Sequence, residues 1–416
     1  MEELVGTLLE ELGIRPDSTV GAAAIQAARD VQPVVSAITA TAAKWQVRIT
    51  QLFKRHRLSS EHFAPTTGYG YGDRGREVLE AVWADAFGGE AALVRPQIVS
   101  GTHAIGLCLG AVCRPGDLLV SALGEPYETV KSVIGLTGQR GSLADYGVRY
   151  CEARGEEELV RAVESGAAAV FIQRSGGYSQ RRALSVAQIA RLVSVVKGVN
   201  QKTVCIVDNC YGEFVEELEP SHVGADLVAG SLIKNPGGGL APTGGYIVGR
   251  EELIQLVAAR LVVPGSRDLG PSPIGYRHFY QGLWIAPQCV GQALITACFS
   301  ARLFELLGFP VRPKFDEPRG DIIQAIGLGA RERLLAFLRE VQARSPVDSH
   351  VAPEPWLMPG YQHEVAMAAG TFVQGSSIEF SADAPVMAPY EVYLQGGLSA
   401  AHGIWAVIAA AKVIVS

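Results

Sequence analysis

The chain has no long run of basic residues and no extended apolar run, and its first residues lack the pattern expected of a secretory leader. Its 36 lysines and arginines are outnumbered by 42 acidic residues, which gives a net charge of −6. Such a balance argues against nucleic acid or a membrane surface as a partner. The start Met1-Glu2-Glu3 is acidic, and apolar stretches such as Gly403 to Val415 are too short to span a bilayer. We therefore expect a soluble, cytoplasmic protein.

Cysteine is also scarce, with seven residues in a chain of 416. Cys108 and Cys113, like Cys205 and Cys210, lie within apolar stretches without a nearby histidine pattern. Zinc sites and disulfide frameworks remain alternatives, but this pattern favours buried, reduced thiols in a cytosolic protein. We expect no bound metal.

Lysine is scarce as well, and one of the eight lysines stands apart from the others. Lys234 lies between a predicted strand and a glycine-rich turn, with Ser231 three residues before it, and Asp208 ends an earlier apolar run. Pyridoxal 5'-phosphate requires a carboxylate for its pyridine nitrogen, an amine for a Schiff base and donors for its phosphate. Lys234 alone is compatible with a surface loop, and Asp208 alone with a plain strand end. Their order along the chain predicts a site for this cofactor.

Short apolar runs alternate with helical patterns between residues 92 and 250. Amphipathic stretches at 127–134, 156–165 and 186–197 separate several of the runs. This alternation predicts an α/β fold with a mostly parallel sheet that is covered on both faces. Ligands bind beyond the carboxyl ends of the strands in such sheets, where Asp208 and Lys234 would both lie. The predicted strands are 92–99, 118–122, 147–151, 167–173, 203–208, 227–231 and 245–248.

We expect the chain to be organised in three parts. They are an N-terminal helical segment at 1–60, a large cofactor-binding domain at 61–285 and a C-terminal small domain at 286–416. Helical spacing within 20–57 supports the first part. The end of the chain, 356–394, has the pattern of a small antiparallel α+β unit. The smaller domain would be assembled from both termini.

A phosphate-binding turn is predicted at Gly101 and Thr102. These residues follow a strand and open a helical stretch, so free backbone amides and the positive helix end would meet there. An ordinary helix cap is the alternative. His103 would either pack on the cofactor or cap the helix, and we favour the first. The segment around Lys234 is not a nucleotide P-loop, because Asn235 follows the lysine.

Three further residues have side chains suited to this cofactor. Tyr127 follows the next strand and could stack on the ring and carry protons, although tyrosines in such places often only pack. Tyr71 and Arg74 lie in a glycine-rich loop and offer a hydroxyl and a guanidinium for the phosphate. Taken alone, these two would be ordinary surface residues.

These motifs together resemble fold-type-I pyridoxal-phosphate enzymes of the cystathionine/methionine gamma-lyase superfamily, over about residues 60–250. The chain is similar almost from end to end to the narrower methionine gamma-lyase-like, or aluminum resistance protein, family. The narrower resemblance rests on the segments 68–75, 100–103, 208–214, 231–234, 280–283, 286–287 and 395–398.

The resemblance implies a role for each matching residue. Lys234 would form the Schiff base and then act as the acid–base group, with Asp208 on the pyridine nitrogen and Tyr127 stacked on the ring. The fold would be that of the aspartate-aminotransferase-like transferases. Gly101, Thr102 and Ser231 would hold the phosphate, joined by Tyr71 and Arg74 from a neighbouring subunit. A homodimer or homotetramer with shared active sites is therefore implied.

The C-terminal region lacks the arginine with which gamma-lyases hold the substrate α-carboxylate. The last arginine is Arg344, and Met387 stands where the family pattern has arginine. A thioether cannot hold a carboxylate in a bidentate manner. Arg174, Arg267 or Arg277 could replace it, or the ligand is not an ordinary amino acid.

Three functions are compatible with these residues. The first is a carbon–sulfur lyase that performs beta- or gamma-elimination on a sulfur-containing amino acid. The second is an aminotransferase or desulfurase on the same scaffold, because the cofactor stores electrons in all of these reactions. The third is a non-catalytic, cofactor-bound stress or binding protein, which the missing arginine supports. We favour the lyase.

Overall fold

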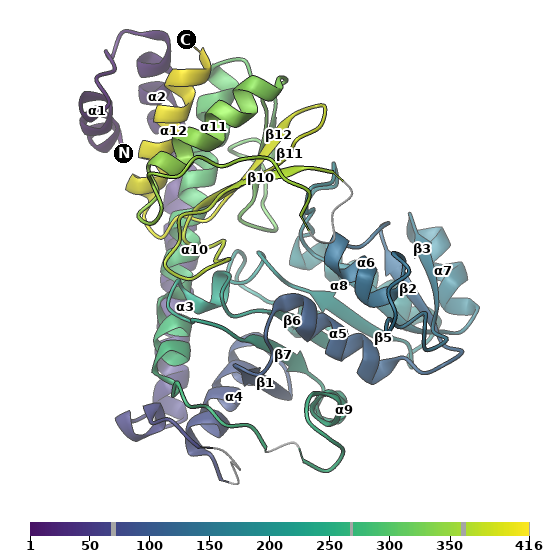
Figure 1. Cartoon of the computed structure of the whole chain (residues 1–416). Helices are drawn as coiled ribbons and strands as arrows, with labels where there is room; N and C mark the ends of the chain where they lie inside the picture. The colour runs from purple at the N-terminus through teal and green to yellow at the C-terminus, as the bar shows by residue number, and fades with distance from the viewer. Residues whose placement is uncertain (68–71, 267–268, 359–362, 416) are drawn as a thin grey trace.

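The computed structural model describes residues 1–67, 72–266, 269–358 and 363–415, and it contains two sheets. Figure 1 shows a lower part built on the larger sheet and an upper part that holds both termini. The long helices α3 (Gln32–Arg55) and α10 (Arg277–Leu306) lie side by side and join the two parts. The boundaries predicted after residues 60 and 285 stay predictions, and the second falls inside α10.

The larger sheet has seven strands in the order β1-β7-β6-β5-β4-β2-β3. β7 runs antiparallel to both of its neighbours, whereas the pairs from β6 to β3 are parallel. The predicted α/β fold with a mostly parallel sheet is thereby confirmed. The strands are β1 (Ala91–Arg95), β2 (Leu118–Ala122), β3 (Arg149–Ala153), β4 (Ala167–Gln173), β5 (Val204–Asp208), β6 (Leu227–Ser231) and β7 (Gly245–Gly249).

Both faces of this sheet are buried, so its central strands are continuous apolar runs. On β5, for example, Ile206 belongs to the core on one face and Val207 to the core on the other. α5 and α9 pack on the Ile206 face, and α4 and α8 on the Val207 face. The helices of this part are α4 (Arg74–Phe87), α5 (Gly101–Val112), α6 (Glu128–Ile134), α7 (Glu156–Glu164), α8 (Val186–Val199) and α9 (Glu251–Leu261), with short 3-10 turns η1 (Ser60–Phe63), η2 (Pro220–Val223) and η3 (Asn235–Gly237).

The smaller sheet is antiparallel throughout, in the order β10-β11-β12-β9-β8. Helices from both ends of the chain contribute to its core, so the N- and C-termini meet in the upper part of Figure 1. The strands are β8 (Val311–Arg312), β9 (Gln324–Gly327), β10 (Val365–Ala368), β11 (Ser381–Pro385) and β12 (Glu391–Gln395), and the helices are α1 (Glu2–Glu11), α2 (Thr19–Asp30), α11 (Arg331–Ala343) and α12 (Ala400–Val415).

Helix α10 runs through the boundary predicted after residue 285 and belongs to both parts of the molecule. By length and composition it is the one described helix that could cross a membrane, and 78% of its apolar window is buried inside the protein. That burial is typical of a core helix. Pro287 lies inside α10, and such a residue weakens a helical prediction at that point.

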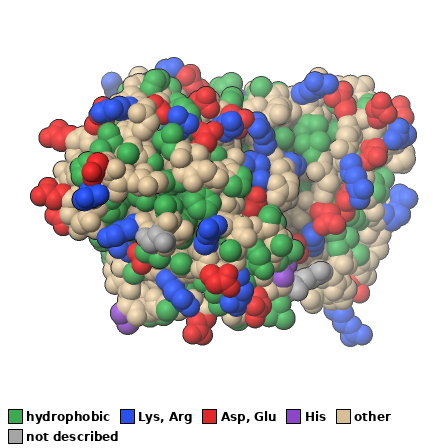
Figure 2. All heavy atoms as spheres, turned by 90° about the horizontal axis from the view of Figure 1, so that it is seen from above, with side chains coloured by type: hydrophobic (Ala, Val, Ile, Leu, Met, Phe, Trp, Pro, Cys, Tyr) green, Lys and Arg blue, Asp and Glu red, His purple; other side chains and the backbone are tan. Residues whose placement is uncertain are grey.

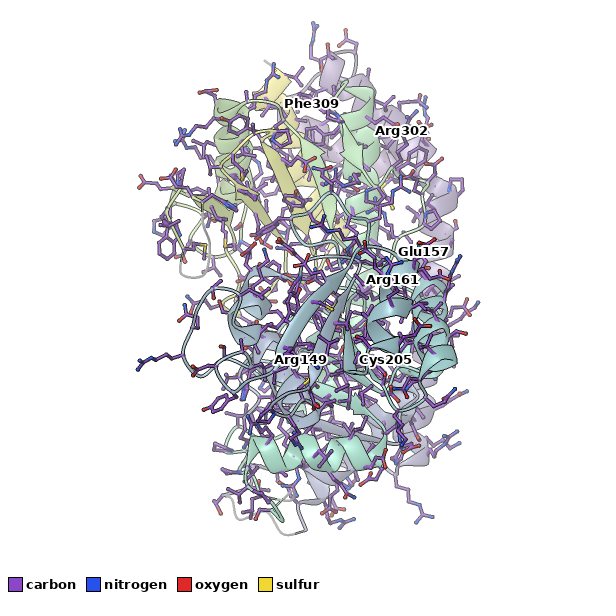
Figure 3. All side chains as sticks on the ribbon, turned by 90° about the vertical axis from the view of Figure 1, so that its right-hand side faces the viewer. Arg149, Glu157, Arg161, Cys205, Arg302 and Phe309 are labelled. Carbon is purple, nitrogen blue, oxygen red and sulfur yellow. The ribbon has the colours of Figure 1, made fainter. Side chains whose placement is uncertain are left out.

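Charged side chains of both signs are interspersed on the face shown in Figure 2. In the side view of Figure 3, Cys205 lies on the large sheet, and Arg302 and Phe309 lie in the upper part. Glu157 and Arg161 form an exposed pair on α7 with 3.9 Å between their charged atoms. All seven cysteines are free thiols.

Candidate active site

The carboxyl ends of two adjacent parallel strands place Asp208 and Lys234 at the same edge of the large sheet. Asp208 is the last residue of β5, and Ser231 is the last residue of β6. Lys234 follows three residues later, directly before the turn η3. The pair predicted from the sequence is therefore brought together by the strand order.

A cavity of about 40 Å³ contains both of these residues. The ammonium Nζ of Lys234 lies 4.0 Å from the ring centroid of Tyr211, which is the geometry of a cation–π contact. The cavity is lined by Tyr127, Gln173, Ser175, Gly177, Tyr178, Asp208, Cys210, Tyr211, Lys234, Ile323, Asp383, Tyr393 and Gln395.

The electrostatics of this cavity favour a charged lysine opposite a carboxylate. Burial opposes the charge of Lys234, but the acidic groups of Cys210, Tyr211 and Asp208 raise its pKa above the ordinary value. Burial raises the pKa of Asp208, although Lys234 and a hydrogen bond from the backbone of Cys210 at 3.1 Å counteract it. A buried carboxylate is stabilised by a cationic partner. Asp208 is thus suited to hold a protonated nitrogen in the cavity.

The start of α5 forms a cradle beside this cavity. Ser100 caps the helix by accepting a hydrogen bond from the amide N–H of His103 at 3.1 Å. The amides of Gly101 and Thr102 also belong to the first turn, where N–H groups have no partner within the helix. A Cβ atom built on Gly101 would lie 3.0 Å from the Cys210 sulfur and 3.3 Å from the Cβ of Ser231. Any larger residue at this position would crowd the approach to the helix start. Amides, a hydroxyl and a helix N-terminus together suit a phosphate.

Of the other residues predicted for the site, Tyr127 lines the cavity, whereas His103 and Arg74 do not. Tyr127 lines the Lys234 cavity, with its ring centroid 6.0 Å from that of Tyr178. His103 accepts the Val99 amide N–H at 3.2 Å on its Nδ1 and so helps to close the helix start. Arg74 is exposed and pairs with Glu61 at 3.1 Å. Tyr71 lies outside the described residues. The cofactor contacts of these residues stay predictions.

The carboxylate of Asp383 faces the cavity from β11 of the small domain and was missed by sequence reasoning. Its Oδ2 accepts hydrogen bonds from the Tyr178 hydroxyl at 3.0 Å and the Gln395 amide at 2.7 Å. Burial raises the pKa of Asp383 to about 6, although both hydrogen bonds oppose the shift. The available signal was a single acid within a strand of small residues, Ser381-Ala382-Asp383-Ala384.

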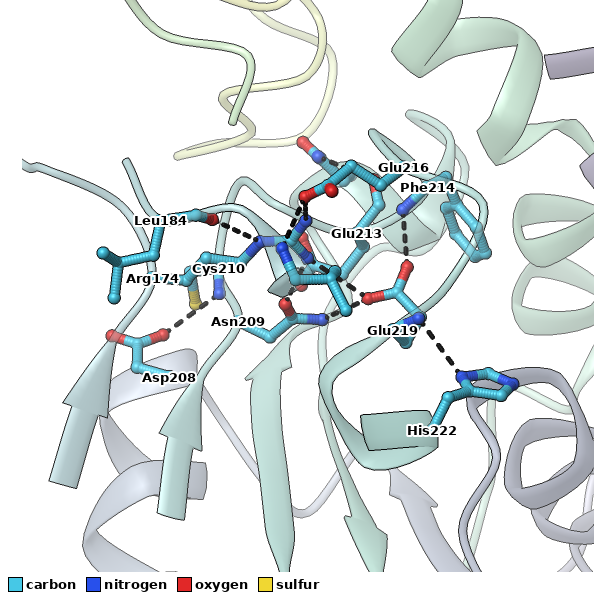
Figure 4. A network of polar contacts seen from close by, with 12 residues as sticks. Arg174, Leu184, Asp208, Asn209, Cys210, Glu213, Phe214, Glu216, Glu219 and His222 are labelled. Carbon is cyan, nitrogen blue, oxygen red and sulfur yellow. Dashed lines mark hydrogen bonds and ion pairs between the residues drawn. The ribbon is translucent and has the colours of Figure 1, made fainter. Parts of the chain in front are cut away.

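Arg174 cannot replace the missing carboxylate-binding arginine, contrary to one of the alternatives raised by the sequence. Its guanidinium is fully buried and donates to Asn209 at 2.8 Å and to Glu216 at 2.9 Å, with Glu219 at 3.4 Å (Figure 4). These partners occupy the donors that a substrate would need. Arg277 is exposed at the start of α10 and lines no part of the Lys234 cavity. Arg267 lies outside the described residues.

The Arg174 network extends through Asn209, the next residue after Asp208, to a further buried acid, Glu213. The Asn209 amide donates to Glu219 at 2.9 Å and to the Tyr246 hydroxyl at 3.2 Å, and that hydroxyl donates to Glu213 at 2.8 Å. Burial raises the pKa of Glu213 to about 8. The protonated form therefore predominates at neutral pH.

We expect Glu213→Gln to flatten the pH dependence of stability. Because the pKa of Glu213 is about 8 in the folded state against 4.5 ordinarily, the folded protein binds more protons between these values. The free energy of unfolding then falls as the pH rises from about 5 to about 8. Glutamine cannot ionise, so the variant should lose this contribution.

Urea unfolding at several pH values measures the pH dependence of stability in wild type and variant. Glu217→Gln, at an exposed position, is the control, and equal slopes for Glu213→Gln and wild type would contradict the assignment.

The residues of the cavity and the cradle fit pyridoxal phosphate. Asp208 offers a carboxylate for the pyridine nitrogen and Lys234 offers an amine for the carbonyl carbon. The backbone amides of Gly101 and Thr102 and the hydroxyl of Ser231 offer hydrogen-bond donors for the phosphate.

Comparisons with known proteins agree with this arrangement. Residues 21–415 match the family model described as methionine gamma-lyase. The uncharacterized protein YnbB of Bacillus subtilis is 46% identical over 389 residues, which cover 91% of this chain and 92% of YnbB. A carbon–sulfur lyase involved in aluminum resistance from Clostridium novyi NT has a solved structure with 42% identity, 98% coverage of both chains and a TM-score of 0.92. The pyridoxal-5'-phosphate-dependent protein YhfS from Escherichia coli, at 19% identity, a TM-score of 0.61 and coverage of 88% and 94%, shares the fold alone.

Proposed function

The chain belongs to the methionine gamma-lyase family and is a carbon–sulfur lyase of the pyridoxal-phosphate-dependent class, and from this premise we propose that it cleaves a sulfur-containing amino acid at the Lys234 cavity. One observation carries the proposal. The cavity combines Lys234 and Asp208 with the cradle at Gly101 and Ser231.

Each residue of the site has a distinct task in this proposal. Lys234 would hold the cofactor covalently and later take the proton from the α-carbon of the substrate. Asp208 would keep the pyridine nitrogen protonated, and Gly101, Thr102 and Ser231 would hold the phosphate. Tyr127 would cover the ring and orient it. When bound, the cofactor supplies an electron sink that stabilises negative charge at the substrate carbon. The products would be a thiol, ammonia and a 2-oxo acid.

We further propose a cytoplasmic homodimer or homotetramer. Arg74 is exposed and absent from the lining of the Lys234 cavity in its own chain. A contribution of Arg74 to the phosphate therefore requires a second subunit. The seven free thiols are in keeping with a reducing compartment.

The proposal predicts two results with the purified protein. Addition of pyridoxal phosphate should give a protein-bound visible absorption band, and sulfur amino acids should then release thiol and 2-oxo acid in equal amounts. A panel of substrates with the sulfur on the β- or the γ-carbon shows which bond is cleaved. Formation of 2-oxo acid only with an added amino acceptor would identify an aminotransferase instead. A bound cofactor without turnover of any amino acid would favour a binding role.

A further inference from the structure

A second cavity, of about 350 Å³, lies beside the cavity of about 40 Å³ that holds Lys234. Its walls come from residues 176–188, after β4 of the large domain, and from residues 312–325 of the small domain. Gly177, Ile323 and Tyr393 line both cavities. These three residues therefore form the partition between the two spaces.

The wall of this second cavity is basic, with four arginines and one acid. Arg181 donates to the backbone oxygens of Gln173 at 2.8 Å and Ser175 at 2.5 Å. Arg319 donates to the side-chain oxygen of Gln324 at 2.5 Å, and its buried Nε has no hydrogen-bond partner among the described residues. Both guanidiniums thus contact neutral oxygens only, and within the described ranges neither forms an ion pair. A partly desolvated cation in such surroundings is stabilised by an added anion.

The acids near the wall offset only part of its positive charge. Asp321 is the acid in the lining, and it interacts with Arg181 and Arg319 without forming a direct ion pair with either. The other two arginines of the lining are paired, Arg182 with Glu317 at 2.8 Å and Arg312 with Glu391 at 3.2 Å. The lining and its ion pairs thus contain four arginines and three acids. Asp208 also interacts with Arg181, but it faces Lys234 in the smaller cavity.

We infer that this arginine-lined cavity is a substrate subsite for a carboxylate at the far end of the thioether, beyond the bond that is broken. The inference rests on the proposed function. Lys234 is the only lysine or arginine that lines the smaller cavity in the described part of the chain. A carboxylate that contacts the arginines therefore lies outside the cavity that holds Lys234, on the other side of the partition. The preferred substrates would be thioether amino acids with a distal carboxylate rather than an alkyl end such as that of methionine.

The test compares two sulfur-free amino acids on the cofactor-loaded protein. 2-Aminoheptanedioate and 2-aminoheptanoate have the same chain length and differ only in the terminal carboxylate, and neither can undergo carbon–sulfur cleavage. Calorimetric titration should give the dicarboxylate a dissociation constant at least about tenfold lower. The binding of either compound is measured whether or not the protein is a lyase, so failure of this inference and failure of the proposed function are separable.

Arg319→Gln should remove the difference between the two compounds while leaving the binding of 2-aminoheptanoate unchanged. Arg319→Lys keeps the charge but loses the planar fork, so it should retain part of the preference. Arg331→Gln, at an exposed position at the start of α11, is the matched control and should bind both compounds as wild type does. If Arg319→Gln fails to fold, the lysine variant still reports on the site.

Titrations with glutarate and inorganic sulfate distinguish a substrate carboxylate from a free anion. Weak binding of both, together with Arg319-dependent binding of 2-aminoheptanedioate, supports the subsite. Equal affinity of wild type for the two amino acids overturns it, as does glutarate or sulfate that binds as tightly as 2-aminoheptanedioate. With S-(2-carboxyethyl)-L-cysteine and S-propyl-L-cysteine as a cleavable pair, Arg319→Gln should raise KM about tenfold for the first alone.

Discussion

Replacing Lys234 by alanine is expected to reduce carbon–sulfur bond cleavage by about 10³-fold or more while leaving the protein folded. The effect is large because one amine has two tasks, the covalent attachment of the cofactor and the transfer of the α-proton. The cavity offers no substitute, since none of its other lining residues is a lysine or an arginine in the described ranges. Parallel assays of thiol and 2-oxo acid release in wild type and variant measure the loss.

Two further measurements make the Lys234 result specific. Treatment of the loaded wild-type protein with borohydride, followed by peptide mass spectrometry, should place the cofactor on the peptide that contains residue 234. Lys44→Ala is the control, because Lys44 is exposed and pairs with Glu217 at the surface, and this variant should keep full activity and the visible band. Full turnover by Lys234→Ala, or the cofactor on another lysine, would overturn the assignment.

The large sheet and its strand-end residues could be predicted because their signals are local. Strands buried on both faces are apolar at nearly every position, so β2, β4 and β6 were predicted with the same bounds that the structure shows. Asp208 and Lys234 each end or follow such a run. Once the strands are parallel neighbours, their side chains must meet at one edge.

The substrate side of the cavity could not be predicted, because its residues come from distant parts of the chain. Asp383 accepts a hydrogen bond from Tyr178 across the interface between the two domains. The sequence around an acid in a strand does not show which distant residue will pair with it. Arg174 was equally ambiguous, since its partners Glu216 and Glu219 follow about 40 residues later. Neither burial nor pairing is visible in a single sequence when both depend on tertiary packing.

Arg174→Met is expected to destabilise the protein by about 3–5 kcal/mol. The substitution keeps much of the side-chain volume but removes the cation that faces the fully buried carboxylate of Glu219. It also takes away the donor to the Asn209 oxygen, next to Asp208. A buried carboxylate without a partner costs more free energy than the ion pair contributes when intact. Urea unfolding followed by circular dichroism measures the difference.

The source of that destabilisation can be separated from a general loss of packing. If the unpaired charge is responsible, adding Glu219→Gln to Arg174→Met should recover part of the lost free energy, because glutamine is neutral and still accepts the Phe214 amide N–H that Glu219 binds at 2.8 Å. Arg149→Met, at an exposed position on β3, should change stability by less than about 0.5 kcal/mol. A double variant no more stable than Arg174→Met would show that packing around the arginine stem dominates. The close packing of the Arg174 stem on Gly212, where a Cβ atom would lie 2.4 Å from the Arg174 side chain, would then account for the lost stability.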